Sequence, residues 1–117
     1  MNLMATLATF AAHQRRNDEL CRTLADRGID LEEARAVELH FWCPEQQDAA
    51  LLAKALYQLG FLVLVIAPEQ TDETTRWNVE AGLKEPVALI ASNEFTTRMI
   101  ELALEHASEY DGSGTSV

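Results

Sequence analysis

The chain has 117 residues, 48% of them hydrophobic, with nine basic and nineteen acidic residues and a formal net charge of −10. This length and apolar content suit one ordinary globular domain with a substantial core. The acidity opposes binding to nucleic-acid phosphates and to anionic lipid, and it favours contact with basic protein surfaces. The longest apolar runs are far shorter than the roughly 20 residues that a membrane-spanning helix needs.

The acidic residues are unevenly distributed along the chain. Residues 1–36 hold five arginines and six acidic residues, whereas residues 37–117 hold four basic and thirteen acidic residues, a net charge of −9. The opening stretch is mildly apolar, but its basic residues follow the apolar ones, which is the wrong order for a secretory signal. Cys21 and Cys43 have no metal-binding or redox spacing, so we expect free thiols in a cytoplasmic protein.

The first predicted element is an N-terminal helix over residues 1–28. One face collects residues at three- and four-residue steps: Leu3, Leu7, Phe10, Gln14, Asn17, Cys21 and Leu24. The middle of this face is polar, so we expect the helix to pack at its two ends and to be loosely held between them. Gly28 is placed for a left-handed C-cap, from which Ile29 folds back onto Leu24.

A strand and a second helix follow. Residues 36–43 alternate, with one face formed by Val37, Leu39, Phe41 and Cys43 and the other by Glu38, His40 and Trp42. Pro44 is placed as the first residue of the next helix. The apolar stripe of that helix consists of Ala49, Leu52, Ala53, Leu56 and Leu59. Gly60 is expected to end it, with Phe61 contacting Leu56 across the cap.

The second half of the chain predicts a hairpin and a third long helix. Residues 61–67 and 75–81 read as two strands joined by a turn at residues 68–72, and residues 87–91 are ambiguous between strand and helix. A helix is expected from Asn93, capped by Ser92 or Asn93 itself. Its apolar stripe would be Phe95, Met99, Leu102, Ala103 and His106, with the histidine partly buried. Residues 108–117 form either a last edge strand or a frayed end.

This order of elements predicts an α+β fold in a single domain covering residues 1–117. The β-α-β-β-α-β succession over residues 36–117 is typical of the ferredoxin-like two-layer sandwich, here with an additional N-terminal helix over residues 1–28. Two helices would cover one face of an antiparallel sheet. The other face would display Glu38, His40 and Trp42, whether or not the N-terminal helix covers them.

The sequence shows no catalytic or metal-binding pattern, so we expect no enzyme, no cofactor and no metal. The three histidines lie far apart, and His40 and Cys43 would point to opposite faces of their strand. Residues 112–114 form neither a nucleophile elbow nor a phosphate-binding loop. Trp42 lacks the basic surroundings of an RNA-binding aromatic, which favours a place beneath the N-terminal helix or in a protein interface.

Several segments, in this order, resemble the RraB family of ribonuclease E regulators. They are Arg16-Asn17-x-x-Leu20, Gly28-Ile29-Asp30, Arg35-Ala36-Val37-Glu38-Leu39-His40-Phe41, Gly60-Phe61 and Glu109-Tyr110-Asp111-Gly112-Ser113-Gly114-Thr115. The family usually has Trp where this chain has Ser113. The resemblance implies a ferredoxin-like sandwich and an acidic cytoplasmic protein without catalysis, which binds ribonuclease E and inhibits its endonuclease action on RNA.

The resemblance also suggests the residues that contact the partner. They are Tyr110, Asp111, Gly112 and Gly114, followed by Glu38 and His40. A structural interpretation competes for two of them, in which Tyr110 packs at the sheet edge and Asp111 belongs to the closing turn. One alternative function is a small-molecule-binding or enzymatic domain with a pocket between the N-terminal helix and the sheet around Glu38, His40 and Trp42. Another is an acidic antitoxin-like or immunity-like module that neutralises some other basic protein.

Overall fold

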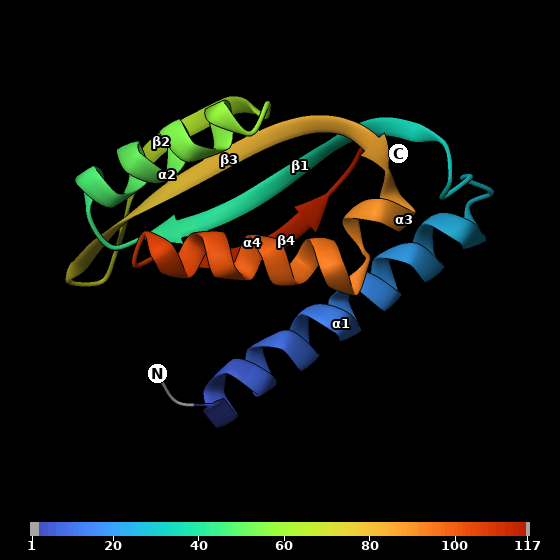
Figure 1. Cartoon of the computed structure of the whole chain (residues 1–117), viewed down its shortest axis with the longest axis horizontal. Coiled ribbons are helices and arrows are strands. Elements are labelled where there is room, and N and C mark those ends of the chain that lie inside the picture. The colour runs from blue at the N-terminus through green and yellow to red at the C-terminus, as the bar shows by residue number, and fades with distance from the viewer. Residues whose placement is uncertain (1–2, 117) are drawn as a thin grey trace.

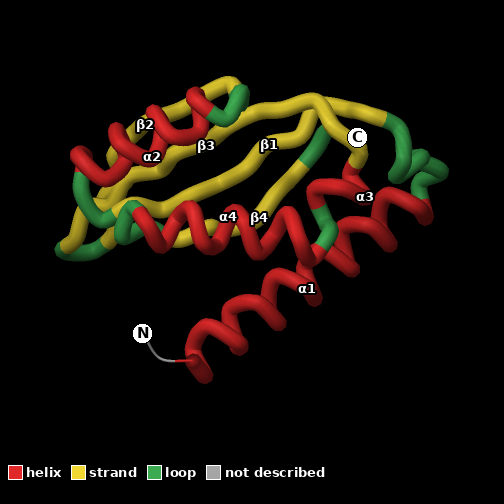
Figure 2. The backbone as a smooth tube through the Cα atoms, in the orientation of Figure 1, coloured by secondary structure: helices red, strands yellow, loops and turns green. Residues whose placement is uncertain are grey.

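The fold was analysed in a computed structural model that describes residues 3–116. Its elements are α1 (Leu3–Asp26), β1 (Ala34–Cys43), α2 (Gln46–Gln58), β2 (Leu62–Thr71), β3 (Thr74–Pro86), α3 (Val87–Ile90), α4 (Asn93–Glu105) and β4 (Glu109–Gly114). The four strands form one antiparallel sheet in the order β2-β3-β1-β4. Helices α2 and α4 cover one face of this sheet, and α1 lies beside α4 (Figures 1 and 2). The prediction of an α+β, ferredoxin-like sandwich with an additional N-terminal helix is confirmed.

The core lies between the sheet and the two covering helices. Alternation in β1 directs its apolar residues inward, and Leu39 and Phe41 are completely buried. They meet the apolar stripes of the helices, from which Leu52, Leu56 and Met99 are buried. Burying a side chain of this size contributes about 1.5–3 kcal/mol to folding. Periodicity of two in the strand and of 3.6 in the helices therefore builds one common core.

Two glycines end the helices as the sequence predicts. Gly28 and Gly60 have φ values of +75° and +93°, in the left-handed region that favours glycine. Beyond each glycine the chain folds back, because the Ile29 N–H donates to the Leu24 carbonyl and the Phe61 N–H donates to the Leu56 carbonyl, both at 3.0 Å. Ser92 caps α4, since its hydroxyl accepts a hydrogen bond from the Phe95 N–H.

The hairpin is longer than predicted. Strand β2 continues through Pro68 to Thr71, and the turn tightens to Asp72 and Glu73, with Asp72 at φ +51°. An edge strand tolerates proline because one side of it has no ladder to complete. Residues 87–90, ambiguous between strand and helix in the sequence, form the short helix α3. Of the two alternatives for residues 108–117, the edge strand is the one observed, as β4.

Two expectations about α2 are wrong. The N-cap is Glu45, so Pro44 precedes the helix instead of starting it. Leu59, expected in the buried stripe, is 49% exposed. The stripe needs a facing surface to be buried, and the end of α2 has none, because α2 and α4 stand apart over the sheet (Figure 1).

Helix α1 packs through its polar middle, contrary to the expectation that its apolar ends hold it. His13 and Asn17 are buried, whereas Leu7 towards the N-terminal end is 53% exposed. The Asn17 Nδ2 donates to Thr96 Oγ1 of α4 at 3.0 Å, and the His13 ring stacks on Tyr110 of β4 with 5.0 Å between ring centroids. Satisfied hydrogen bonds and stacking let these polar side chains be buried. Leu24 is buried at the C-terminal end, as expected.

Candidate functional site

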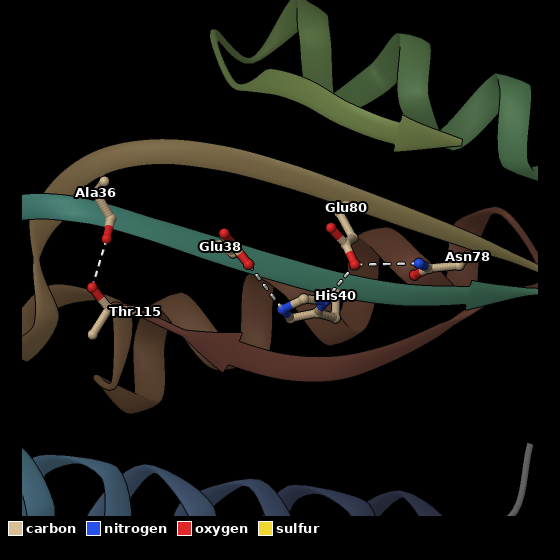
Figure 3. A network of polar contacts seen from close by, with 6 residues as sticks. All are labelled: Ala36, Glu38, His40, Asn78, Glu80 and Thr115. Atoms are coloured by element: carbon tan, nitrogen blue, oxygen red, sulfur yellow. Dashed lines mark hydrogen bonds and ion pairs between the residues drawn. The ribbon is translucent and has the colours of Figure 1, made fainter. Parts of the chain in front are cut away.

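The uncovered face of the sheet carries Glu38, His40 and Trp42 of β1, as the alternation predicts. Their neighbours in the sequence are buried under the helices, so these three side chains point away from the core. Figure 3 shows Glu38 and His40 on this face. Helix α1 contacts α4 and β4 on the helical side, and Trp42 therefore does not lie beneath it. For the same reason α1 cannot form one wall of a pocket with Glu38, His40 and Trp42, so the predicted ligand pocket is wrong.

His40 lies between two carboxylates on this face (Figure 3). Its Nε2 is 3.7 Å from Glu38 Oε2, and its Nδ1 is 3.4 Å from Glu80 Oε1 of β3. The Asn78 Nδ2 donates to the same Glu80 oxygen at 3.3 Å. Carboxylates held in this way remain able to accept hydrogen bonds from the lysine or arginine side chains of a partner. The cluster is therefore suited to recognising the basic side chain of a protein partner.

Two glycines lie next to these carboxylates. In the β1–β4 ladder Glu38 is opposite Gly114 and His40 is opposite Gly112. A Cβ atom added to either glycine would meet nothing within 4 Å. The sheet is thus bare beside Glu38 and His40, and a partner backbone can approach closely there.

The far end of the same face is aromatic. The Arg76 guanidinium lies over the Trp42 ring, 3.7 Å from its centroid. A hollow of about 290 Å³ opens beside them, with Pro44 and Glu109 on its rim. A tryptophan with a stacked arginine is a common anchor at the centre of protein interfaces.

The predicted partner-binding residues divide between two environments. Glu38, His40, Gly112 and Gly114 lie side by side on what we call the open face, the uncovered sheet surface of β1, β3 and β4. Tyr110 is only 4% exposed and packs inward against Phe41 and His13. Burial raises the pKa of Tyr110 well above its usual range, so the phenol stays neutral. These contacts favour the structural interpretation of Tyr110.

Asp111 is exposed and is held by helix α1. The Arg16 Nη1 donates to the Asp111 carbonyl at 3.2 Å and is 3.8 Å from its carboxylate. Arg16 also approaches His13 Nδ1 at 3.2 Å. Asp111 therefore joins β4 to α1 at the edge of the sheet. The sequence gives no local signal for this contact, because the partners are 95 positions apart.

Two further residues of the open face, Arg76 and Glu80, were predicted to point outward but were not among the predicted partner-binding residues. Glu80 and Arg76 belong to β3 and reach the face through the register that pairs His40 with Glu80. Alternation within the predicted strand at residues 75–81 places both on the outward side, but only the register with β1 brings Glu80 next to His40.

Within residues 3–116, no cluster of three or more His, Cys, Asp and Glu side chains is arranged to hold a metal ion. Cys21 and Cys43 are unpaired, as predicted, and burial raises the pKa of both thiols, which keeps them protonated. None of the helices described combines the length and the apolar character that crossing a membrane requires.

Comparison with protein-family models gives a match to RraB, regulator of ribonuclease activity B, over residues 14–115. Comparison with curated proteins gives no match. The family match begins within α1 and extends past the end of β4, so it includes the whole sheet and all of the open face. The chain therefore belongs to the RraB family, a family of regulators of ribonuclease activity.

Proposed function

We propose that this protein binds ribonuclease E in the cytoplasm and slows its cleavage of RNA, and that it does so by contact alone, without a catalytic step. The observation that carries the proposal is the family match over residues 14–115. The unpaired cysteines fit a reducing compartment. The net charge of −10 supports a protein partner with a basic surface, since it opposes direct binding to RNA.

The open face is the surface that we propose for this contact. Glu38 and Glu80 offer carboxylates to lysine or arginine, and the bare backbone at Gly112 and Gly114 lets a partner segment lie flat on the sheet. Trp42 supplies an apolar anchor at one end. A segment of ribonuclease E that is basic because it binds RNA would be recognised by this combination. With this protein bound to that segment, RNA would have to compete for the same basic side chains.

A cleavage assay tests the proposal. Purified ribonuclease E is given a labelled single-stranded RNA, and the initial rate is followed as the protein is added at low and at high salt. We expect the rate to fall with added protein, and we expect the effect to weaken as salt rises, because exposed charges are screened. An unchanged rate at every protein concentration would overturn the proposed function.

Matched substitutions test the place of contact. Gly114→Arg puts a bulky side chain where the structure leaves room, so it should block the open face without unfolding the protein. Glu38→Lys reverses one open-face charge, and Glu73→Lys at the hairpin turn makes the same change in net charge elsewhere. We expect the first two variants to lose inhibition by about tenfold and the third to lose less than about twofold. Equal losses for the two lysine variants would show that only net charge matters.

A further inference from the structure

The helical side of the sheet contains an apolar groove that the proposed function does not use. It lies between the end of α2 and the length of α4, with Phe61 and Leu83 partly buried in it. One section has a volume of about 300 Å³ and the adjoining section about 200 Å³, and both are lined by Leu59 and Arg98. We call these two adjoining hollows the α2–α4 groove.

Two leucines are about half exposed at the groove. Leu59 is 49% exposed and Leu89 is 47% exposed, and both line the groove. Leu59 belongs by its spacing to the apolar stripe of α2, so its exposure reflects a missing neighbour between the two helices. Exposed apolar side chains gathered in one hollow are typical of a binding site for another protein.

The charges around the groove are almost all negative. Four carboxylates line it, from Glu85, Glu94, Glu101 and Glu105, together with the Arg98 guanidinium. An apolar floor inside a charged rim is the usual anatomy of an interface core and its surroundings. The rim attracts a partner that carries lysine or arginine beside its apolar residues. It also repels a second copy of this chain, whose net charge is −10.

We propose that the α2–α4 groove binds a basic amphipathic helix of a partner protein, with leucine-like side chains on Leu59 and Leu89 and with lysine or arginine side chains on the acidic rim. An amphipathic helix binds a hydrophobic groove by laying its apolar side chains into it, with its polar side chains at the rim. The groove is on the opposite side of the sheet from the open face. Where the partner is ribonuclease E, this inference rests on the proposed function and adds a second point of contact.

A synthetic peptide tests the groove without any ribonuclease. The probe is a fluorescent helix of about 18 residues, with leucine at positions i, i+3, i+4 and i+7 and with lysine or arginine on the flanks. Binding is measured by fluorescence anisotropy at about 0.03 M and about 0.3 M salt. In one control peptide glutamate replaces the basic residues. The other control peptide keeps the composition of the probe but has its leucines scattered around the helix. We expect the probe alone to bind, and more weakly at high salt.

Substitutions in the protein locate the binding. Leu59→Ser with Leu89→Ser removes two half-exposed leucines from the groove, and Leu51→Ser with Leu104→Ser removes two leucines of similar exposure, 48% and 43%, that do not line it. We expect the first pair to weaken probe binding at least about tenfold and the second less than about twofold. Glu94→Lys with Glu101→Lys should weaken binding and flatten its salt dependence. Circular dichroism confirms that each variant is folded.

Three results would overturn the inference. They are equal binding of the acidic or scattered peptide, equal losses for the two leucine pairs, and self-association of the protein that Leu59→Ser with Leu89→Ser abolishes. Probe binding without any effect on ribonuclease E cleavage would retain the groove and refute the proposed function. Inhibition of cleavage without probe binding would retain the proposed function and refute the groove as a helix-binding site.

Discussion

The hydrogen bond between Asn17 and Thr96 holds α1 to the body of the protein, and removing it should be costly. The Asn17 Nδ2 donates to Thr96 Oγ1 at 3.0 Å, and the two residues are 8% and 1% exposed. Asn17→Ala leaves the Thr96 hydroxyl buried without this partner, which costs about 1–3 kcal/mol. For a domain of this size each kcal/mol lowers the melting temperature by about 4 °C. We therefore expect a loss of about 4–12 °C.

A double-mutant cycle separates the hydrogen bond from general packing. Thr96→Val keeps the shape of the side chain but leaves the Asn17 amide without its acceptor, so it should also cost about 1–3 kcal/mol. Asn17→Ala combined with Thr96→Val removes both partners of the bond, so the double variant should lose less stability than the sum of the two single losses. Urea unfolding followed by circular dichroism gives each free energy.

Two results would refute this account of α1. A loss below about 0.5 kcal/mol for Asn17→Ala would show that the bond does not hold the helix. Strictly additive losses would show that the two side chains are not coupled. Hydrogen exchange gives an independent reading, because the amides of α1 should lose protection in Asn17→Ala before those of β1.

Three further predictions concern pH, the glycines and the core. Burial and the nearby Arg16 lower the pKa of His13 in the folded protein, and a hydrogen bond with the Tyr110 backbone and the Asp111 charge offset this only in part. As pH falls below about 6.5 the unfolded chain therefore binds the proton first, and the stability of the fold decreases. His13→Phe should make the unfolding free energy less dependent on pH between about pH 7.5 and 5, and an unchanged slope would contradict this. Gly112→Ala should cost about 1 kcal/mol by thermal unfolding, because Gly112 has φ +112°, whereas Gly114→Ala should be nearly neutral; equal losses would contradict the difference in backbone conformation. Leu39→Ala should cost about 2–5 kcal/mol in urea, because Leu39 is completely buried, and a loss below about 1 kcal/mol would place it outside the core.

The sequence predicts those elements whose buried faces are continuous. Strand β1 and helices α2 and α4 are predicted correctly because each has its apolar residues on one buried face. Gly28 and Gly60 mark the ends of helices because they adopt the left-handed conformation. The docking of α1 was not predictable from periodicity, because it depends on polar side chains whose partners lie far along the chain. The exposure of Leu59 was not predictable either, since it depends on the distance between two helices.

The open face was predictable only in part. Alternation directs Glu38 and His40 outward, but their neighbours on β4 depend on the register between two distant strands. A β-bulge between His40 and Phe41 gives β4 one extra residue, so that Phe41 is opposite Tyr110 and His40 is opposite Gly112. Simple alternation would place Tyr110 and Gly112 on the same face. The bulge separates them, which puts the ring in the core and leaves the glycine on the surface.

The strand order also determines when the protein can fold during synthesis. Strand β1 is made early, yet both of its neighbours come later: Ala34 pairs with Pro86, and Glu38 pairs with Gly114. Pairings so distant in sequence form slowly, and β1 stays an unpaired apolar strand until β3 has left the ribosome. The open face is complete only when β4 has joined the other edge of β1. A nascent chain is therefore expected to be inactive as a regulator until its last strand has emerged.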